Sequence, residues 1–240
     1  MIRLEFRKMR RLRTAPTLIV LVIAVVALSS ASLFSGDPAA MPWASLLLSY
    51  TFMAAMTSPL LAAVLASRLT DIEHAGVGWT LAATAGHSPG ALCRAKLAAL
   101  GLVLFPAVAA QSLLVVGAGL VAGIRGPLDL GPWLGYTVLL FLVDLAFVAL
   151  HVWLAAVVEN QLVSVGVGLL GAFLAVFSLL APGPFARFVP WGYYAVISYA
   201  TQRGGDVVYA PPPYAWIATF LILVALVFAL ATRGLDRVER

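Results

Sequence analysis

The amino-acid sequence predicts an all-α, polytopic membrane protein with six transmembrane helices. Three observations support this fold class: six long apolar stretches, a low content of charged residues, and a one-sided distribution of Lys and Arg. Of the 240 residues, 62% are hydrophobic and only 10% are charged. A water-soluble core could not bury so much apolar surface. We therefore expect one transmembrane domain over residues 1–240.

Each apolar stretch is long enough to cross a bilayer as a helix. About 20 apolar residues in a helix span the ~30 Å of hydrocarbon. The six stretches are 15–34, 44–66, 97–122, 133–158, 162–181 and 213–232.

The basic residues predict which side of the membrane each end occupies. Six spans place both termini on one side, and cytoplasmic loops carry the excess of Lys and Arg. Cytoplasmic termini put twelve basic residues on that side and three outside, so we expect this orientation. The charges flank membrane spans and form no stripe with interleaved aromatics, which argues against nucleic-acid binding. The twelve are Arg3, Arg7, Lys8, Arg10, Arg11, Arg13, Arg68, Arg94, Lys96, Arg233, Arg237 and Arg240, and the three are Arg125, Arg187 and Arg203.

The first stretch has an alternative interpretation as a secretory signal. It follows a basic leader and contains small residues at 29–32 that resemble a cleavage site. Cleavage would leave five spans. The apolar run continues to Phe34, which is longer than most signal cores, so we expect an uncleaved span.

Residues 1–14 predict an interfacial helix. Ile2, Phe6 and Met9 recur at helical spacing, and Arg or Lys fills most of the other positions. Such a helix lies in the headgroup layer with its apolar side down. The alternative is a simple basic anchor for the first span.

The loop at 67–96 is the only long one on the basic side. Thirty residues suffice for a short helix, a turn and a second short helix. The loop contains Trp79, and a large aromatic usually marks packing or an interface. We expect a partner to dock there, with a solvated connector as the alternative.

No motif in the chain predicts catalysis. Gly86, Ser88 and Gly90 fit GxSxG, but the nucleophile elbow needs a preceding strand and a later acid and His. The only later histidine is His151, inside a span.

The single cysteine, Cys93, excludes an internal disulfide and a cysteine metal cluster. The sequence contains no phosphate-loop motif, no HExxH motif and no GxGxxG that follows a strand. We expect no enzyme activity, metal or cofactor in this chain.

The segment at 182–212 predicts a re-entrant external loop. It is rich in aromatics and has prolines at both ends. Aromatics prefer the membrane interface, so short helices there could dip back and cap a pathway. Pro190 and Trp191 are the candidate external gate. An aromatic belt without a gating role is the alternative.

Polar residues inside the spans are candidate pathway groups. Asp144 lies near the middle of the fourth span, and His151 follows two turns later on the same face. A carboxylate at this depth must be paired, protonated or hydrated. The two residues could line a polar path or relay protons, or they could be satisfied by local partners.

Small residues in the fifth span predict close helix packing. Ser164, Gly168 and Ala172 recur at four-residue spacing, which lets helix backbones approach closely in lipid. These small residues could pack against another helix of the same subunit or form a contact between two subunits.

The pattern of spans and loops resembles the permease subunits of type-2 ABC transporters. It is most similar to the branch for lantibiotic and peptide-antibiotic export and self-immunity. The chain departs from that pattern at 85–89, where relatives often have a Pro, a small residue and a basic residue. The matching residues are Arg68, Asp71, Glu73, Gly78, Trp79, Leu81, Leu92, Ala95 and Lys96, then Glu159, Asn160, Pro190 and Trp191.

The resemblance implies a bacterial half-transporter in the plasma membrane. Two permeases, identical or similar, would enclose a pathway, and two separate ATPase subunits holding ATP and Mg²⁺ would dock at 67–96. The substrate would be an amphipathic peptide, antibiotic or lipid that the transporter exports from the membrane. The implied ATPase-coupling residues are Arg68, Asp71, Glu73, Trp79, Arg94 and Lys96.

Two other classes remain open from the residues alone. One is a proton-coupled secondary transporter that uses Asp144 and His151, although inverted repeats typical of that class are not evident. The other is an intramembrane enzyme, for which a serine protease would need Ser and His on facing helices.

Overall fold

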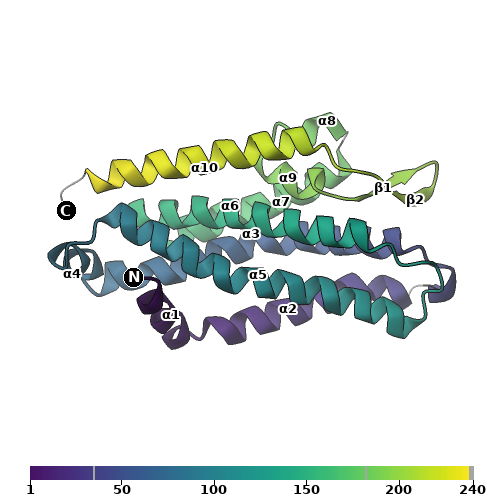
Figure 1. Cartoon of the computed structure of the whole chain (residues 1–240), viewed down its shortest axis with the longest axis horizontal. Coiled ribbons are helices and arrows are strands. Elements are labelled where there is room, and N and C mark those ends of the chain that lie inside the picture. Colours follow the sequence, from purple (N-terminus) through teal and green to yellow (C-terminus); the bar gives the residue numbers. More distant parts are fainter. Residues whose placement is uncertain (35, 182, 238–240) are drawn as a thin grey trace.

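The computed structural model describes residues 1–34, 36–181 and 183–237 and consists of a bundle of long helices lying side by side (Figure 1). Within this part of the chain, six helical segments are long and apolar enough to cross a membrane, which confirms the predicted fold class. They are α2 with η1 (Thr14–Ser30 and Ala31–Phe34), α3 (Trp43–Ala75), α5 (Pro89–Ala122), α6 (Leu130–Val157), α7 (Gln161–Leu180) and α10 (Tyr214–Asp236).

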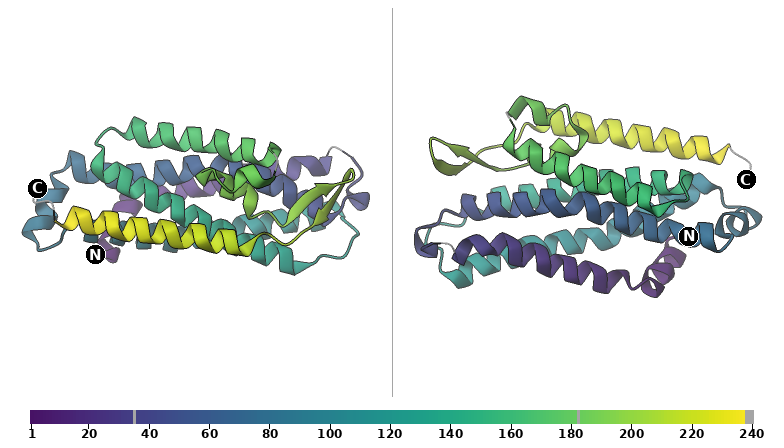
Figure 2. Two further views of the ribbon diagram at one scale, coloured as in Figure 1. Left: turned by 90° about the horizontal axis from the view of Figure 1, so that it is seen from above. Right: turned by 180° about the vertical axis from the view of Figure 1, so that it is seen from behind.

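The two ends of the bundle differ in charge and in structure. Helices α1 (Ile2–Arg11) and α4 (Gly78–Thr84) lie at the end where α10 finishes, and we call this the basic end. The opposite end, the hairpin end, carries η2 (Pro38–Ala40) and the strands β1 (Ala200–Arg203) and β2 (Asp206–Tyr209), as both views in Figure 2 show. Of the residues named above, Arg240 and Pro182 lie outside the described residues.

Helix α3 is the centre of the bundle and α10 is at its edge. Helix α3 contacts α2, α5, α6 and α7, and its side chains Leu46, Tyr50 and Ala55 are fully buried. Helix α10 packs mainly on α5 and α6 and leaves Leu223 and Val227 exposed. Exposed apolar side chains along a span face lipid in a membrane.

Helices α3 and α5 extend beyond a bilayer, and this corrects the predicted loop. They have 33 and 34 residues, so each is about 50 Å long against ~30 Å of hydrocarbon. Residues 67–75 continue α3, and residues 89–96 begin α5. Residues 67–96 are therefore not a separate loop along their whole length: only 76–88 connect α3 to α5, and α4 is the one separate helix there among the described residues. Ser88 as N-cap and Pro89 in the first turn explain why α5 begins so early.

The small-residue row on α7 packs against α3 within one chain. A Cβ placed on Gly168 would lie 2.5 Å from the Cβ of Ala63 and 2.9 Å from the carbonyl oxygen of Pro59. Ser164 and Ala172 are buried on the same helix. Pro59 lies inside α3, and the missing side chain of Gly168 allows α7 to approach it.

The segment after α7 folds into short helices alongside the bundle. Elements α8 (Gly183–Ala186), η3 (Pro190–Gly192) and α9 (Tyr193–Val196) pack on α7, and α9 also contacts α3 and α6 (Figure 1). We call α8, η3 and α9 the re-entrant segment.

The β1–β2 hairpin that follows was not predicted. Its strands are antiparallel, with Ala200 opposite Tyr209. Gly204 and Gly205 form the turn, both with positive φ (59° and 99°). Two glycines between short polar and β-branched runs are a typical hairpin signal, and this signal could have revealed it.

The contact at Gly168 makes a testable prediction about stability. We expect Gly168→Ala to lower the thermal midpoint of the detergent-solubilised protein, because overpacking a close helix contact costs about 1–3 kcal/mol. The matched control is Gly166→Ala on the same helix, where a Cβ meets nothing within 4 Å. Alanine favours a helix by roughly 1 kcal/mol over glycine, so the control should keep or raise the midpoint. Equal midpoints for the two variants would contradict the packing.

Candidate functional site at the basic end

Four charged side chains from three helices meet at the basic end and form the buried ion cluster. Lys96 Nζ on α5 lies 3.0 Å from Glu5 Oε2 on α1 and 2.7 Å from Glu73 Oε1 on α3. It also donates to the carbonyl oxygen of Leu69, at 2.9 Å. Lys8 Nζ on α1 lies 2.7 Å from Glu5 and 2.5 Å from Glu73. The cluster joins α1, α3 and α5 in one set of contacts.

Burial makes this cluster strongly dependent on its pairing. Lys96 is 0% exposed, and Glu5 and Glu73 are each 3% exposed. Two cations and two carboxylates balance each other, whereas a single buried charge left without a partner is costly. Burial lowers the pKa of Lys8, but hydrogen bonds and charge attraction from Glu5 and Glu73 outweigh it, so this pKa lies above its ordinary value. The cluster is stable only as a complete set.

Arg68 connects α3 to the turn between α1 and α2. Its guanidinium donates to the carbonyl oxygen of Leu12, at 3.2 Å, and to Thr17 Oγ1, at 3.4 Å. Between them, Arg13 adopts a left-handed conformation with φ of 54°, which is uncommon for a residue with a side chain. Arg68 therefore holds the sharp turn from α1 into the first span.

Helix α4 is attached to the ends of α3 and α6 through one histidine. Trp79 Nε1 donates to His74 Nδ1, at 3.3 Å. The other ring nitrogen, Nε2, then carries the hydrogen and donates to the carbonyl oxygen of Ala155, at 2.8 Å. The two aromatic rings also pack edge to face, with centroids 5.6 Å apart. His74 thus bridges α4 and α6.

Helix α4 also lies directly against the ion cluster. A Cβ on Gly78 would lie 2.1 Å from Glu73 Oε2, so only glycine allows this approach. The preceding residue, Val77, has a φ of 54°, which is a strained conformation for a β-branched side chain. The strain is maintained because the contacts on both sides determine the path of the chain.

The start of α5 is joined to the end of α10. Ser88 Oγ accepts from the backbone N–H of Ala91 as a helix cap and donates to Asp236 Oδ1, at 2.5 Å. Arg94 pairs with the other oxygen of Asp236, at 3.1 Å. A Cβ on Gly90 would lie 2.0 Å from the carbonyl oxygen of Thr232. Ser88 is therefore a helix cap, and the GxSxG match is a coincidence of spacing.

The six predicted coupling residues come together at this end, but most of them face inward. Glu73 and Lys96 belong to the ion cluster, Arg68 and Arg94 bind other parts of the same chain, and Trp79 is half-buried. Asp71 is also half-buried. Trp79 belongs to α4 and Glu73 lies against it, whereas Arg68 and Arg94 join other helices, and only Arg94 of the six is exposed.

The exposed apolar residues of this end were not identified from the sequence. Val77, the N-cap residue just before α4, and Leu81, within α4, are each 65% exposed. We call this pair the α4 face. Two apolar residues at helical spacing in a polar loop were the available signal. The sequence also gave no indication that Glu5, Lys8, His74 and Asp236 would be partners in these contacts.

Inside the spans, Asp144 and His151 have separate partners. Tyr194 Oη donates to Asp144 Oδ1, at 2.8 Å, and Ser58 Oγ lies 3.5 Å from Oδ2. His151 Nδ1 lies 3.0 Å from Ser164 Oγ. Both residues are buried, and among the described residues neither a hydrogen bond nor an ion pair links them. Asp144 holds the re-entrant segment through Tyr194.

Of the two candidate gate residues, Trp191 is half-buried against the bundle and Pro190 is exposed. Trp191 stacks on Phe147 of α6, with ring centroids 5.5 Å apart, and Tyr194 stacks on Phe147 at 5.4 Å. The Trp191 indole also lies where a Cβ on Gly171 of α7 would be. Pro190 begins η3 just before it.

Within the described chain, no group of three or more metal-ligating side chains is suited to hold a metal ion.

The ion cluster predicts a large effect for one substitution. We expect Lys96→Met to destabilise the protein by about 3–5 kcal/mol, because it leaves a buried carboxylate unpaired. The loss should appear as a lower thermal midpoint in detergent. Arg94→Met is the matched control, since its ion pair is 45% exposed on the Arg side and such pairs contribute about 0–1 kcal/mol.

A second substitution separates charge from packing in this prediction. Glu5→Gln in the Lys96→Met background removes the surplus negative charge and should recover part of the lost stability. Equal midpoints for Lys96→Met and Arg94→Met, or no recovery in the double variant, would contradict the role of the cluster.

Comparison with known proteins places this geometry in a family. The family described as ABC-2 family transporter protein matches residues 1–175, which include α1, α4 and the buried ion cluster. The comparison with curated proteins yields no match. The family match covers well over half of the 240 residues. The chain therefore belongs to the ABC-2 family of transporters and is a multi-pass permease subunit.

Proposed function

We propose that this chain is the permease of an ATP-driven exporter whose separate ATPase docks on the α4 face. Membership of the ABC-2 family implies an ATPase partner. One observation supports this docking site: Val77 and Leu81 are exposed, although Trp79 attaches α4 to the bundle through His74. Exposed apolar residues outside the lipid-facing surface mark protein interfaces.

Helix α4 lies outside the hydrocarbon of the bilayer, where a water-soluble partner could bind it. It lies at the tip of the basic end (Figure 1), where α3 and α5 run past the length needed to cross the bilayer. Lipid therefore does not account for the exposure of Val77 and Leu81. A pocket on an ATPase subunit would bury them.

The contacts around α4 provide a route for movement into the bundle. Trp79 and His74 connect it to α3 and α6, and Gly78 places it against Glu73 of the ion cluster. From there Lys96 leads to α5 and α1. A rigid set of contacts moves as a unit when ATP closes the ATPase pair. We expect this motion to switch the permease between inward-facing and outward-facing states.

The remaining features of the proposal follow from charge and from the family resemblance. The excess of Lys and Arg at the basic end supports a cytoplasmic location for it and for both termini. We propose two permeases and two ATPases, with ATP and Mg²⁺ on the ATPases, in a bacterial plasma membrane. The substrate would be an amphipathic peptide, antibiotic or lipid, as in lantibiotic export and immunity.

The proton-coupled alternative has weaker support. It needs proton exchange between Asp144 and His151, and each of them bonds to different groups. Asp144 instead has a structural partner, Tyr194, that holds the re-entrant segment.

The α4 face makes a prediction about ATPase binding. We expect Leu81→Asp to weaken co-purification of the ATPase at least ten-fold, which corresponds to ~1.4 kcal/mol, and to abolish transport-coupled ATP hydrolysis. Membrane insertion and the thermal midpoint should not change, because Leu81 is exposed. Val208→Asp is the matched control, since it puts the same charge on an exposed residue at the hairpin end.

Trp79→Ala tests the attachment of α4 to the bundle separately from the docking of the ATPase. This variant should still bind the ATPase, but with reduced coupling of ATP hydrolysis to transport, since α4 loses its hydrogen bond to His74. Stoichiometric ATPase retained by Leu81→Asp would rule out the α4 face as the docking site.

A further inference from the structure

Helices α6 and α10 contact each other, and a groove runs along the surface between them. This groove, the α6/α10 groove, has a volume of about 630 Å³. Its walls are apolar side chains such as Leu150 and Trp153 of α6 and Leu223 and Val227 of α10. Sites for small molecules in proteins typically measure roughly 300–1,000 Å³. The groove is therefore large enough for a ligand with a long apolar part.

The outer end of this groove carries a cation among aromatic rings. Arg187, which follows α8, places its guanidinium carbon 5.6 Å from the centre of the Trp216 ring. Phe188 packs edge-on against the same ring, at 5.9 Å between centroids. Tyr193 of the re-entrant segment also lines this end. Aromatic side chains of this kind gather where hydrocarbon meets headgroups.

Arg187 brings a positive charge with no carboxylate to balance it. Of the residues that line the groove, it is the sole charged one, and among the described residues it forms no ion pair with Asp or Glu. Burial raises the pKa of Tyr193, and the charge of Arg187 acts in the opposite direction. A guanidinium fork suits a phosphate group, which it can bind with two hydrogen bonds.

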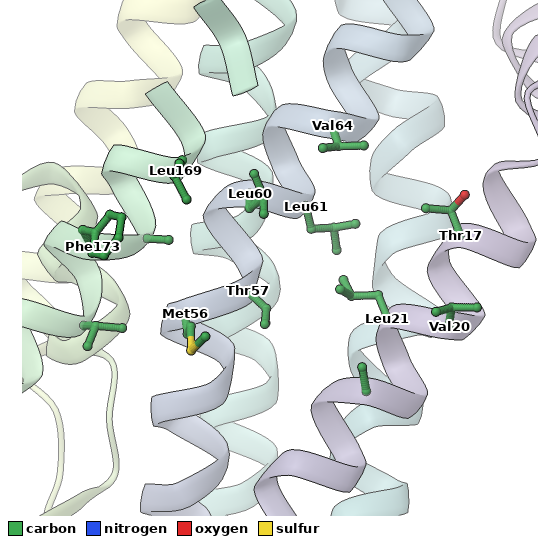
Figure 3. A pocket seen from close by; sticks show the side chains of 13 residues that line it. Thr17, Val20, Leu21, Met56, Thr57, Leu60, Leu61, Val64, Leu169 and Phe173 are labelled. Carbon is green, nitrogen blue, oxygen red and sulfur yellow. The ribbon is translucent and has the colours of Figure 1, made fainter. Parts of the chain in front are cut away.

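The open side of the groove favours an occupant from the bilayer. Leu223 and Val227 line the groove and are also more than half exposed, so an apolar chain can enter sideways from lipid. A second lateral groove, between α2, α3 and α7, is the useful contrast (Figure 3). It measures about 540 Å³ and has no charged residue in its lining. Nothing there would select a headgroup.

We propose that the α6/α10 groove binds one anionic phospholipid, with an acyl chain between the two helices and the phosphate at Arg187. The apolar walls, the sideways opening and the single cation at the interfacial end all match this ligand. The headgroup end of this site is separate from the ATPase-docking site, because Arg187 packs on Trp216 near the start of α10, whereas α4 lies at the end where α10 finishes (Figure 1).

Native mass spectrometry of the purified full-length protein in mild detergent tests this site. Phosphatidylglycerol and phosphatidylcholine with identical acyl chains are titrated in parallel. We expect at least a five-fold preference for phosphatidylglycerol. Arg187→Gln should abolish this preference and Arg187→Lys should retain part of it, because a lysine still offers a positive charge. Arg203→Gln on the exposed hairpin is the matched control and should bind like the unchanged protein.

A groove-filling pair tests the position of the acyl chain. Val224→Trp occupies the α6/α10 groove and should reduce binding of both lipids at least five-fold. Ala24→Trp fills the groove of Figure 3 and should have no effect. A photoreactive amino acid at position 223 should cross-link to lipid.

Three results would overturn the proposal. The first is equal binding of the two lipids by the unchanged protein. The second is a phosphatidylglycerol preference that survives Arg187→Gln, or binding that survives Val224→Trp. The third is cross-linking from position 223 to a second copy of the chain or to another protein, because the groove would then be a protein interface.

Discussion

The pairing of Lys96 with Glu5 and Glu73 is the interaction on which the basic end depends. An amphipathic helix such as α1 would otherwise lie loosely in the headgroup layer. The two carboxylates and Lys8 instead connect it to α3 and α5. Since an unpaired buried charge is costly, the contacts of the cluster form and break together. Helix α4 rests on Glu73 through Gly78, so its position follows from the same cluster.

The rest of the molecule combines a rigid centre with a less tightly packed edge. Helix α3 is buried along much of its length and closely contacts α7 at Gly168. Tyr194 extends this centre outward, because its bond to Asp144 holds the re-entrant segment. Helix α10 is held at its ends by Asp236 and by the Tyr199–Tyr214 hydrogen bond. The α6/α10 groove is lined by residues of α10 that lie between these two attachments.

Several residues of the candidate site were recognisable from the sequence, but their contacts were not. Trp79 was identified because a large aromatic in a polar loop is unusual, yet its partner, His74, could not be inferred from its type or spacing. The family resemblance implies that Glu73 and Lys96 are ATPase-coupling residues, but not that both are buried in one ion cluster. Ion pairs such as Lys96 with Glu5 join residues 91 positions apart, and no local pattern encodes such a pair.

The sequence by itself determined the six spans and the single basic end. Hydrocarbon forces each span to satisfy its own backbone hydrogen bonds, so length and apolar content suffice to identify it. The loops of the sequence also resemble those of type-2 ABC permeases. The family match over residues 1–175 supports membership of the ABC-2 family. Only the tertiary structure decided that α3 and α5 continue past the bilayer and that α4 turns Val77 and Leu81 outward. These features depend on contacts between distant residues, because side-chain pairing in three dimensions overrides what each segment prefers alone.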